Sequence, residues 1–170
     1  CASMWMSATV NLDDLLTVDA PTITRVVELG DDDRNGALGR RLTVTRRIGR
    51  LDVDGKKYPA DLAASIIGAH RPGSRTIAVL NTVKRAGELY DALTKTKTRP
   101  PVVLLHSRFR PPERAERFAH AIAEPGEAGV IVVATQVLEA GVDVDSHLMV
   151  TETAPWSSIV QRAGRCNRSG

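Results

Sequence analysis

The string QRAGRCNR near the C-terminus gathers side chains that suit a phosphate chain. Arg162, Arg165 and Arg168 recur every three residues, on or just past a short predicted helix, so we expect them to project from nearly one side. No acidic residue lies between Gln161 and Gly170 to neutralise them. Guanidinium groups pair bidentately with phosphate oxygens, so a phosphate chain would supply the missing anion. From these residues alone, a solvated helix end is the other interpretation.

A second group of polar residues follows the apolar run 130–134, in the string VVATQVLEAGVDV. Thr135 opens a predicted turn of helix, where its hydroxyl and its backbone N–H could both contact a phosphate. Gly141 breaks this turn, and Asp143 behind it could accept a hydrogen bond from a ribose hydroxyl. The structural alternatives are helix capping by Thr135 and a plain turn role for Asp143.

Four short apolar runs, rich in Val and Ile, predict the strands that must position these residues. Because the runs are continuous rather than alternating, they favour strands buried on both faces of a parallel sheet. Strands alternating with helices predict a doubly wound α/β domain, whose working groups gather outside the carboxyl ends of the strands. The expected strands are residues 76–80, 102–105, 130–134 and 148–151. The expected helices are residues 83–93, 112–123 and 159–163.

The first 60 residues are less regular. Residues 31–39 carry a loop signal, and the mixture of β-branched residues with Gly, Asp and Arg predicts one or two strands, near 25–29 and 41–53. This zone is expected to be a linker.

The composition is that of a soluble globular domain. The 170 residues are 42% hydrophobic and 25% charged with a net charge of +3, which excludes a disordered chain and allows one domain with a proper core. No apolar run approaches the roughly 20 residues that span a bilayer, so we expect no membrane segment and a cytoplasmic setting. Cys1 and Cys166 lack the spacing of metal ligands, and no metal site is expected on this chain.

QRAGRCNR resembles motif VI of superfamily 2 helicases, and the segment from Thr135 to Asp143 resembles their motif V. The resemblance implies that Arg165 and Arg168 are arginine fingers and that Gln161 senses the γ-phosphate of a nucleotide. It also implies that Gly141 and Asp143 face the nucleotide, and that Thr135 touches the nucleic-acid backbone. Most members of the superfamily have glycine where this chain has Asn167.

Three more segments fit the same superfamily in the correct order. The tripeptide Ser7-Ala8-Thr9 resembles motif III, which couples hydrolysis to nucleic-acid binding at the end of a first RecA-like domain. Thr82 lies in a segment that resembles motif IV. Ser107 and Arg108 lie in the next nucleic-acid-contacting segment, where they could hold a phosphate. The neighbouring His106 is expected to be packed, without a chemical role.

Flanking segments narrow the resemblance. Residues 6–19, 58–66, 104–117 and 161–170 together are similar to the CRISPR-associated helicase–nuclease of type I interference systems. This implies a RecA-like parallel sheet flanked by helices over residues 60–170, preceded by a linker at 21–59 and the tail of a first RecA-like domain at 1–20.

The resemblance also implies an activity and its partners. We expect an ATP-driven motor on single-stranded DNA, recruited by a CRISPR surveillance complex. ATP with Mg²⁺ would bind between two RecA-like domains, with the P-loop and the metal ligands supplied by the missing N-terminal one.

The chain lacks other parts of such a motor. It contains no G-x-x-x-x-G-K-[ST] string, no Asp-Glu pair and no His-Asp dyad, and it begins with Cys1 rather than Met. We therefore expect a fragment that hydrolyses no ATP alone. Two alternatives stay open: a general DExH-type RNA or DNA helicase, and a non-catalytic RecA-like module that binds nucleic acid. Preference for a deoxy over a ribo strand would test the first, and the retained arginines argue against the second.

Overall fold

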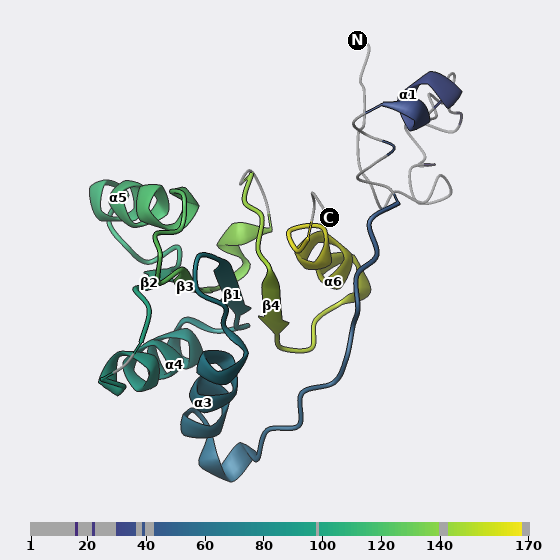
Figure 1. Ribbon diagram of the computed structural model, residues 1–170. Coiled ribbons are helices and arrows are strands. Elements are labelled where there is room, and N and C mark those ends of the chain that lie inside the picture. Colours follow the sequence, from purple (N-terminus) through teal and green to yellow (C-terminus); the bar gives the residue numbers. More distant parts are fainter. Residues whose placement is uncertain are drawn as a thin grey trace. The chain divides into compact units, whose positions relative to one another are not determined.

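A computed structural model (Figure 1) describes residues 16, 22, 30–36, 39, 43–97, 99–139 and 143–167. The chain divides into two units, Cys1–Thr43 and Val44–Gly170. In the described part of the first unit, residues Asp31–Asn35 form helix α1. The described strands all belong to the second unit, and so do the residues of the candidate site described below.

The second unit is built on a four-stranded parallel sheet in the order β2-β3-β1-β4. Its strands are β1 (Arg75–Val79), β2 (Val102–Leu105), β3 (Val130–Ala134) and β4 (Leu148–Thr151). The central strands β1 and β3 are buried at every position, as their continuous apolar runs predicted. The expected limits of β2, β3 and β4 are confirmed, and β1 begins and ends one residue earlier than expected.

Helices cover both faces of this sheet (Figure 1). On one face, buried residues of α3 and α4 such as Leu62, Ile66 and Leu89 pack against Ile131 and Val133 of β3. On the other face, Ala121 of α5 packs in a second cluster that includes Ile77 and Val132. The helices of this unit are η2 (Gly55–Lys57), α3 (Ala60–Ala69), α4 (Val83–Lys95), α5 (Pro111–Ile122), η3 (Gln136–Leu138) and α6 (Trp156–Ala163).

Four of these helices were predicted: α4, α5 and α6 within a few residues, and η3 as the turn of helix after Thr135. The largest difference is at α6, which begins three residues earlier than expected because Pro155, with its fixed φ, leads directly into the helix and accepts a hydrogen bond from Ile159 N. Helix α3 was not predicted. Within the part of the chain that the structure describes, no helix has the length and apolar character to cross a bilayer.

The predictions for the linker zone need correction. The described residues 43–53 of the expected strand form no strand. Ile48 and Leu51 in this stretch are 76% and 47% exposed, and extended chain without a sheet partner is not a strand, although Val53 packs against the core. The loop expected at 31–39 begins with α1 instead, because aspartates in a first turn complement the helix dipole. The strand expected near 25–29 lies outside the described residues.

A buried arginine closes the amino edge of the sheet. Arg75, only 9% exposed, donates through Nη1 to the carbonyl of Asp145 (2.8 Å) and through Nη2 to those of Ile122 (3.1 Å) and Ala123 (2.5 Å). Its Nε has no hydrogen-bond partner among the described residues. Burial lowers the pKa of this guanidinium, while Glu124 and Asp145 act against that shift.

A close backbone approach lies at the same edge. His70 contacts the hydroxyl of Thr76 through Nδ1 (2.9 Å) and the carbonyl of Ala128 through Nε2 (3.0 Å). Gly129 has φ of +77°, and a Cβ at this position would lie 2.5 Å from the carbonyl oxygen of Ser74 and 2.6 Å from Nε2 of His70. Glycine is therefore required here both for its conformation and for its size.

Candidate nucleotide and nucleic-acid site

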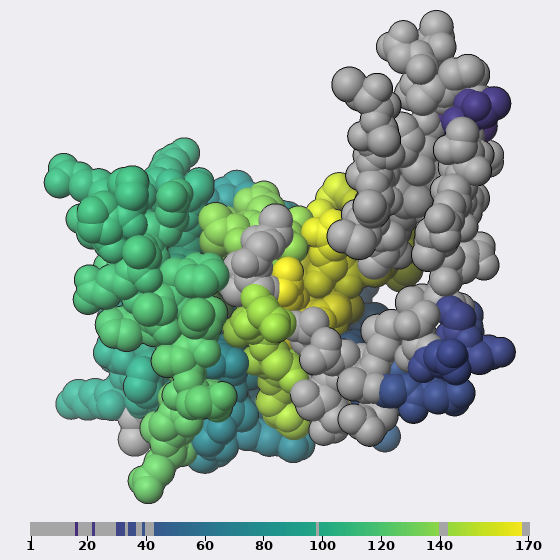
Figure 2. All heavy atoms as spheres, turned by 90° about the horizontal axis from the view of Figure 1, so that it is seen from above, coloured from purple at the N-terminus to yellow at the C-terminus, as the bar shows by residue number. Residues whose placement is uncertain are grey.

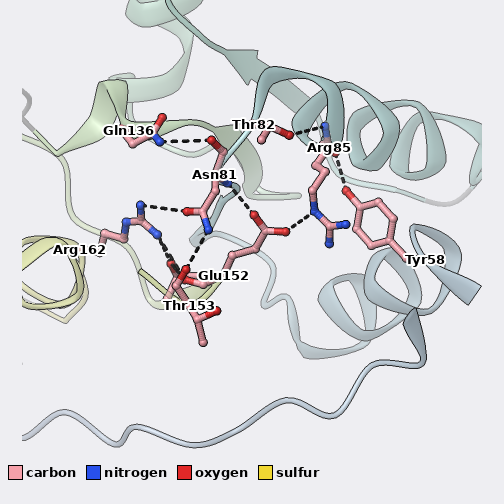
Figure 3. A network of polar contacts seen from close by, with 9 residues as sticks. Tyr58, Asn81, Thr82, Arg85, Gln136, Glu152, Thr153 and Arg162 are labelled. Carbon is pink, nitrogen blue, oxygen red and sulfur yellow. Dashed lines mark hydrogen bonds and ion pairs between the residues drawn. The ribbon is translucent and has the colours of Figure 1, made fainter. Parts of the chain in front are cut away.

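A network of polar side chains joins the carboxyl ends of β1, β3 and β4 (Figure 3). We call it the strand-end network. It comprises Tyr58, Asn81, Arg85, Gln136, Glu139, Thr151, Glu152, Thr153 and Arg162. The parallel strands bring these ends to one edge of the sheet, where the working groups of α/β proteins gather.

Arg162 lies at the centre of this network and is 3% exposed. Its Nη2 forms an ion pair with Oε1 of Glu139 (2.6 Å), and its Nε donates to the same oxygen (2.8 Å). Its Nη1 donates to the hydroxyl of Thr151 (2.6 Å) and, at 3.3 Å, to the carbonyl of Glu152. Nη2 also approaches Oδ1 of Asn81 at 3.5 Å. A single side chain thus contacts the segments that follow β1 and β3 and the end of β4.

Glu139 holds two arginines at once. Oε1 of its carboxylate accepts from Arg162, and Oε2 accepts from the hydroxyl of Ser158 (3.1 Å). Its backbone carbonyl accepts a hydrogen bond from Nη2 of Arg165 (3.2 Å). Side chains on a helix lean toward its N-terminus, so Arg162, in α6, reaches back toward the carboxyl edge of the sheet. Glu139 therefore ties Arg165, a predicted site residue, to the buried Arg162.

The other half of the network surrounds Glu152. Its carboxylate forms an ion pair with Arg85 and accepts from the backbone N–H of Asn81 (2.6 Å). The guanidinium of Arg85 lies 3.9 Å from the ring centroid of Tyr58, whose hydroxyl donates to the carbonyl of Arg85 (2.6 Å). Burial raises the pKa of Tyr58, which keeps this hydroxyl protonated as a donor. Gln136 completes the link to the segment after β3, because its Nε2 donates to the carbonyl of Asn81 (3.2 Å).

The structure corrects the prediction about the three arginines. Arg162 does not project outward: it points inward and is neutralised by Glu139, 23 residues earlier in the chain. Arg165 follows α6 and is partly buried against Glu139, and Gln161 is exposed on α6. Arg168 lies outside the described residues. The yellow residues of α6 reach the molecular surface in Figure 2, beside the light-green residues around β4, which α6 contacts.

The predicted phosphate contacts occupy two neighbouring strand ends. Thr135 is 3% exposed, and its N–H donates to the carbonyl of Leu105 (3.1 Å). The expectation that this N–H serves a phosphate is therefore wrong, since β2 already uses it. The hydroxyl of Thr135 makes no capping hydrogen bond to η3, so the capping alternative is not observed. Ser107 and Arg108 are both exposed in the turn after β2.

Two further predicted residues have visible surroundings. Thr82 caps α4, accepting from the N–H of Arg85 (3.2 Å), and is itself exposed. Asp143 is exposed just before the buried Val144. The tripeptide Ser7-Ala8-Thr9 and Gly141 lie outside the described residues.

A stack of rings supports the turn that carries Ser107 and Arg108. The ring of His106 lies parallel to that of Phe109, with centroids 3.9 Å apart, and the guanidinium of Arg117 lies 4.2 Å from the Phe109 centroid. Burial lowers the pKa of His106, and the charges of Arg117 and Arg108 lower it further. The expectation that His106 is packed agrees with this arrangement. Among the described residues, no cluster of three or more His, Cys, Asp or Glu side chains could hold a metal ion.

Residues 72–170 match the family model described as CRISPR-associated nuclease/helicase Cas3, C-terminal. The chain belongs to the Cas3 family. Curated relatives include the CRISPR-associated helicase Cas3 of Thermoproteus tenax, 30% identical over 135 residues, which are 78% of this chain and 23% of that protein. The CRISPR-associated endonuclease/helicase Cas3 of Thermus thermophilus is 43% identical over 72 residues, 39% of this chain and 8% of that protein. The chain thus spans less than a quarter of the length of these relatives.

Solved Cas3 structures share the fold. The Cas3–ADP complex of T. fusca matches with a TM-score of 0.57 and 33% identity over 63% of this chain and 14% of that one. A chain of a CRISPR RNA-guided surveillance complex before nicking matches with a TM-score of 0.56 and 31% identity, over 71% of this chain and 15% of that one. The predicted fold class, a RecA-like parallel sheet flanked by helices, is confirmed for the second unit.

Proposed function

We propose that this chain is the second RecA-like domain of a longer Cas3 protein that hydrolyses ATP to move along single-stranded DNA in type I CRISPR interference. The observation that carries the proposal is the double hold of Glu139 on Arg162 and Arg165 at the carboxyl edge of the sheet. T. fusca Cas3 structures were solved with ADP, ATP and AMPPNP, and another relative lies in a surveillance complex, which supports the same nucleotide class and partner here.

The nucleotide half of the site centres on Arg165. The Nη2 contact with the Glu139 carbonyl holds the guanidinium of Arg165 at this edge of the sheet, and a guanidinium pairs well with phosphate oxygens. Arg165 and Arg168 would stabilise the charge that develops on the transferred phosphoryl group, and Gln161 would contact the γ-phosphate. Gly141 and Asp143 would face the rest of the nucleotide. Mg²⁺ and a P-loop, held by a first RecA-like domain, would neutralise and bind the phosphate chain.

The nucleic-acid half lies along the next strand ends. The exposed Ser107 and Arg108, the hydroxyl of Thr135 and the exposed Thr82 would contact successive phosphates of one strand. The chain is only 4% aromatic, so backbone contacts rather than base stacking would dominate, and binding would weaken steeply with salt. The strand-end network would link the two halves, from Arg85, which Thr82 caps, to Arg162, which shares Glu139 with Arg165.

The domain limits stay predictions: the tail of a first RecA-like domain at 1–20 with the coupling residues Ser7, Ala8 and Thr9, a linker at 21–59 and the second RecA-like domain at 60–170. We propose a cytoplasmic setting, and that the chain alone hydrolyses no ATP because the P-loop belongs to the first domain.

The test is Arg165→Ala in the full-length protein to which we propose this chain belongs. ATP hydrolysis stimulated by single-stranded DNA should fall about 10³-fold or more, because an arginine finger contributes on that scale. DNA binding at matched salt should stay unchanged. Arg71→Ala, which removes an exposed arginine beside the amino edge, is the matched control. Near-normal hydrolysis by Arg165→Ala would overturn the finger assignment, and equal stimulation by RNA would favour a general helicase.

A further inference from the structure

The stretch before the sheet is hydrogen-bonded to the loop that carries Arg165. Nε of Arg46 donates to the carbonyl of Cys166 (2.6 Å), and Nδ2 of Asn167 donates to the carbonyl of Thr45 (3.3 Å). These residues are 120 or more positions apart in the chain. We call the contact between Thr45–Arg46 and Cys166–Asn167 the linker clasp. All four residues belong to the second unit.

The opposite side of this loop is attached to the sheet. Ser146, just before β4, donates through its N–H (2.9 Å) and its hydroxyl (3.0 Å) to the carbonyl of Arg165. The N–H of Asn167 donates in turn to the carbonyl of Ser146 (2.8 Å). Arg165 is therefore carried by a loop that is bound to the sheet on one side and to the linker clasp on the other.

Asn167 is suited to both parts of this arrangement. Its φ is +49°, in the left-handed region that glycine and asparagine adopt more readily than other residues. Glycine would satisfy this conformation equally well, but only asparagine also offers an amide to the Thr45 carbonyl. The side chain therefore adds a contact without changing the backbone.

Three arginines in the described stretch 43–50 have different surroundings. Nε of Arg46 is used by the Cys166 carbonyl, and the exposed Arg50 pairs with Asp52 at 2.7 Å. Arg47, next to Arg46, is exposed. Arg46 therefore has a partner in the loop that carries Arg165, and the neighbouring Arg47 serves as its control.

We propose that Arg46 and Asn167 are positioning residues: through the linker clasp they fix the loop that presents Arg165 to the nucleotide. This inference rests on the proposed function. The chain before Val44 leads directly into Thr45 and Arg46. Because these two residues are hydrogen-bonded to Cys166 and Asn167, a displacement of the preceding chain would act on the loop through the clasp. The clasp thereby makes the placement of the arginine depend on the path of the linker.

The first test measures the clasp itself, without using activity. Cys166 lies between the two clasp contacts and is partly buried, so opening the clasp should expose its thiol. The rate of alkylation of the Cys166 peptide, read by mass spectrometry at one fixed pH, should rise in Arg46→Ala and in Asn167→Gly. It should not rise in Arg47→Ala. Unchanged alkylation in both clasp variants would overturn the proposal.

The second test measures positioning in the full-length protein. Arg46→Ala and Asn167→Gly should lower kcat for DNA-stimulated ATP hydrolysis about 10- to 100-fold, the scale of a misplaced catalytic group, with KM for ATP unchanged. Arg47→Ala should keep both constants. Normal kcat in the clasp variants, beside an inactive Arg165→Ala, would overturn the positioning role. If Arg165→Ala itself kept its rate, the proposed function would fail, while the alkylation result would still decide whether the clasp exists.

Discussion

The two edges of the sheet each bury an arginine, and the two arginines have different kinds of partner. At the amino edge, the partners found for Arg75 are backbone carbonyls, those of Ile122, Ala123 and Asp145. At the carboxyl edge, Arg162 contacts mainly side chains, those of Glu139, Thr151 and Asn81, besides the carbonyl of Glu152 at 3.3 Å.

This difference separates a structural edge from one that can transmit change. The carbonyls at the end of α5 and in the turn before β4 are held in place by the backbone. By bonding to them, Arg75 stabilises the packing of these two segments against β1. Most partners of Arg162 are side chains from separate segments, and side chains can change rotamer where backbone carbonyls cannot. If a ligand binds at the carboxyl edge as proposed, we expect this edge to pass the change between segments.

The largest expected effect comes from removing each arginine in turn. Arg162→Met should lower the free energy of unfolding by about 3–5 kcal/mol, because Glu139 is left buried without a counter-charge. Arg75→Met should lower it by about 1–3 kcal/mol, the cost of buried carbonyls left without donors. Urea denaturation measures both.

Measuring ATP hydrolysis as well as stability distinguishes the two edges further. Hydrolysis per folded molecule of the full-length protein should be lost in Arg162→Met and kept in Arg75→Met. The double variant Arg162→Met, Glu139→Gln should recover stability but not hydrolysis. Equal losses of hydrolysis at the two edges would break the distinction between them.

A glycine at the amino edge should give the next largest effect. Gly129→Ala should lower the free energy of unfolding by about 2–4 kcal/mol, because the new Cβ meets the Ser74 carbonyl and His70 at a positive φ. Gly126→Ala is the control, since a Cβ there meets nothing within 4 Å. Thermal or urea unfolding measures the difference, and hydrolysis per folded molecule should be unchanged. A selective loss of hydrolysis would show that the amino edge is not merely structural.

The smallest effect is a pH dependence that belongs to the carboxyl edge. Nδ1 of His106 has no hydrogen-bond partner in the described part of the chain, whereas both ring nitrogens of His70 at the amino edge have one. Burial lowers the pKa of folded His106 below its ordinary 6.5, so the unfolded state binds more protons and stability falls as the pH drops through this range.

The free energy of unfolding is measured at about pH 7.5 and at about pH 5.5. The drop between the two should be smaller in His106→Gln than in the unmodified chain, with a difference under about 1 kcal/mol. The exposed His120→Gln should behave like the unmodified chain. Equal drops in the free energy of unfolding for the unmodified chain and His106→Gln would show that His106 is not the source of the pH dependence.

The strands could be predicted because their signal is local. Continuous apolar runs mark β2, β3 and β4 at their observed limits. Burial at every position holds for β3, as expected for a strand covered on both faces, while the edge strands β2 and β4 are only partly buried. Helix α3 was missed although it carries a helical signal: Leu62, Ala63 and Ile66 are its buried face, after Pro59 and with Asp61 in the first turn.

The contacts of the site could not be predicted in the same way. The sequence indicated that Thr135 and Arg165 would lie at the carboxyl edge, but not that Glu139 lies between Arg162 and Arg165. Asn81 and Arg162 are 81 positions apart, and their meeting depends on the order β2-β3-β1-β4, which no local pattern determines. The error about the Thr135 N–H has the same origin, because its partner is at the end of β2.

The strand order also has a consequence for how the domain is made. β1 pairs with β3 and β4, whose residues follow it by about 55 and 72 positions in the register Arg75↔Val130 and Thr76↔Leu148. During synthesis β1 therefore waits, unpaired, until much of the domain has emerged, and such non-local pairing slows folding. Arg162 lies in α6, after every strand. The contacts that Arg162 makes can therefore form only at the end of this process, so a half-made domain lacks the centre of the network.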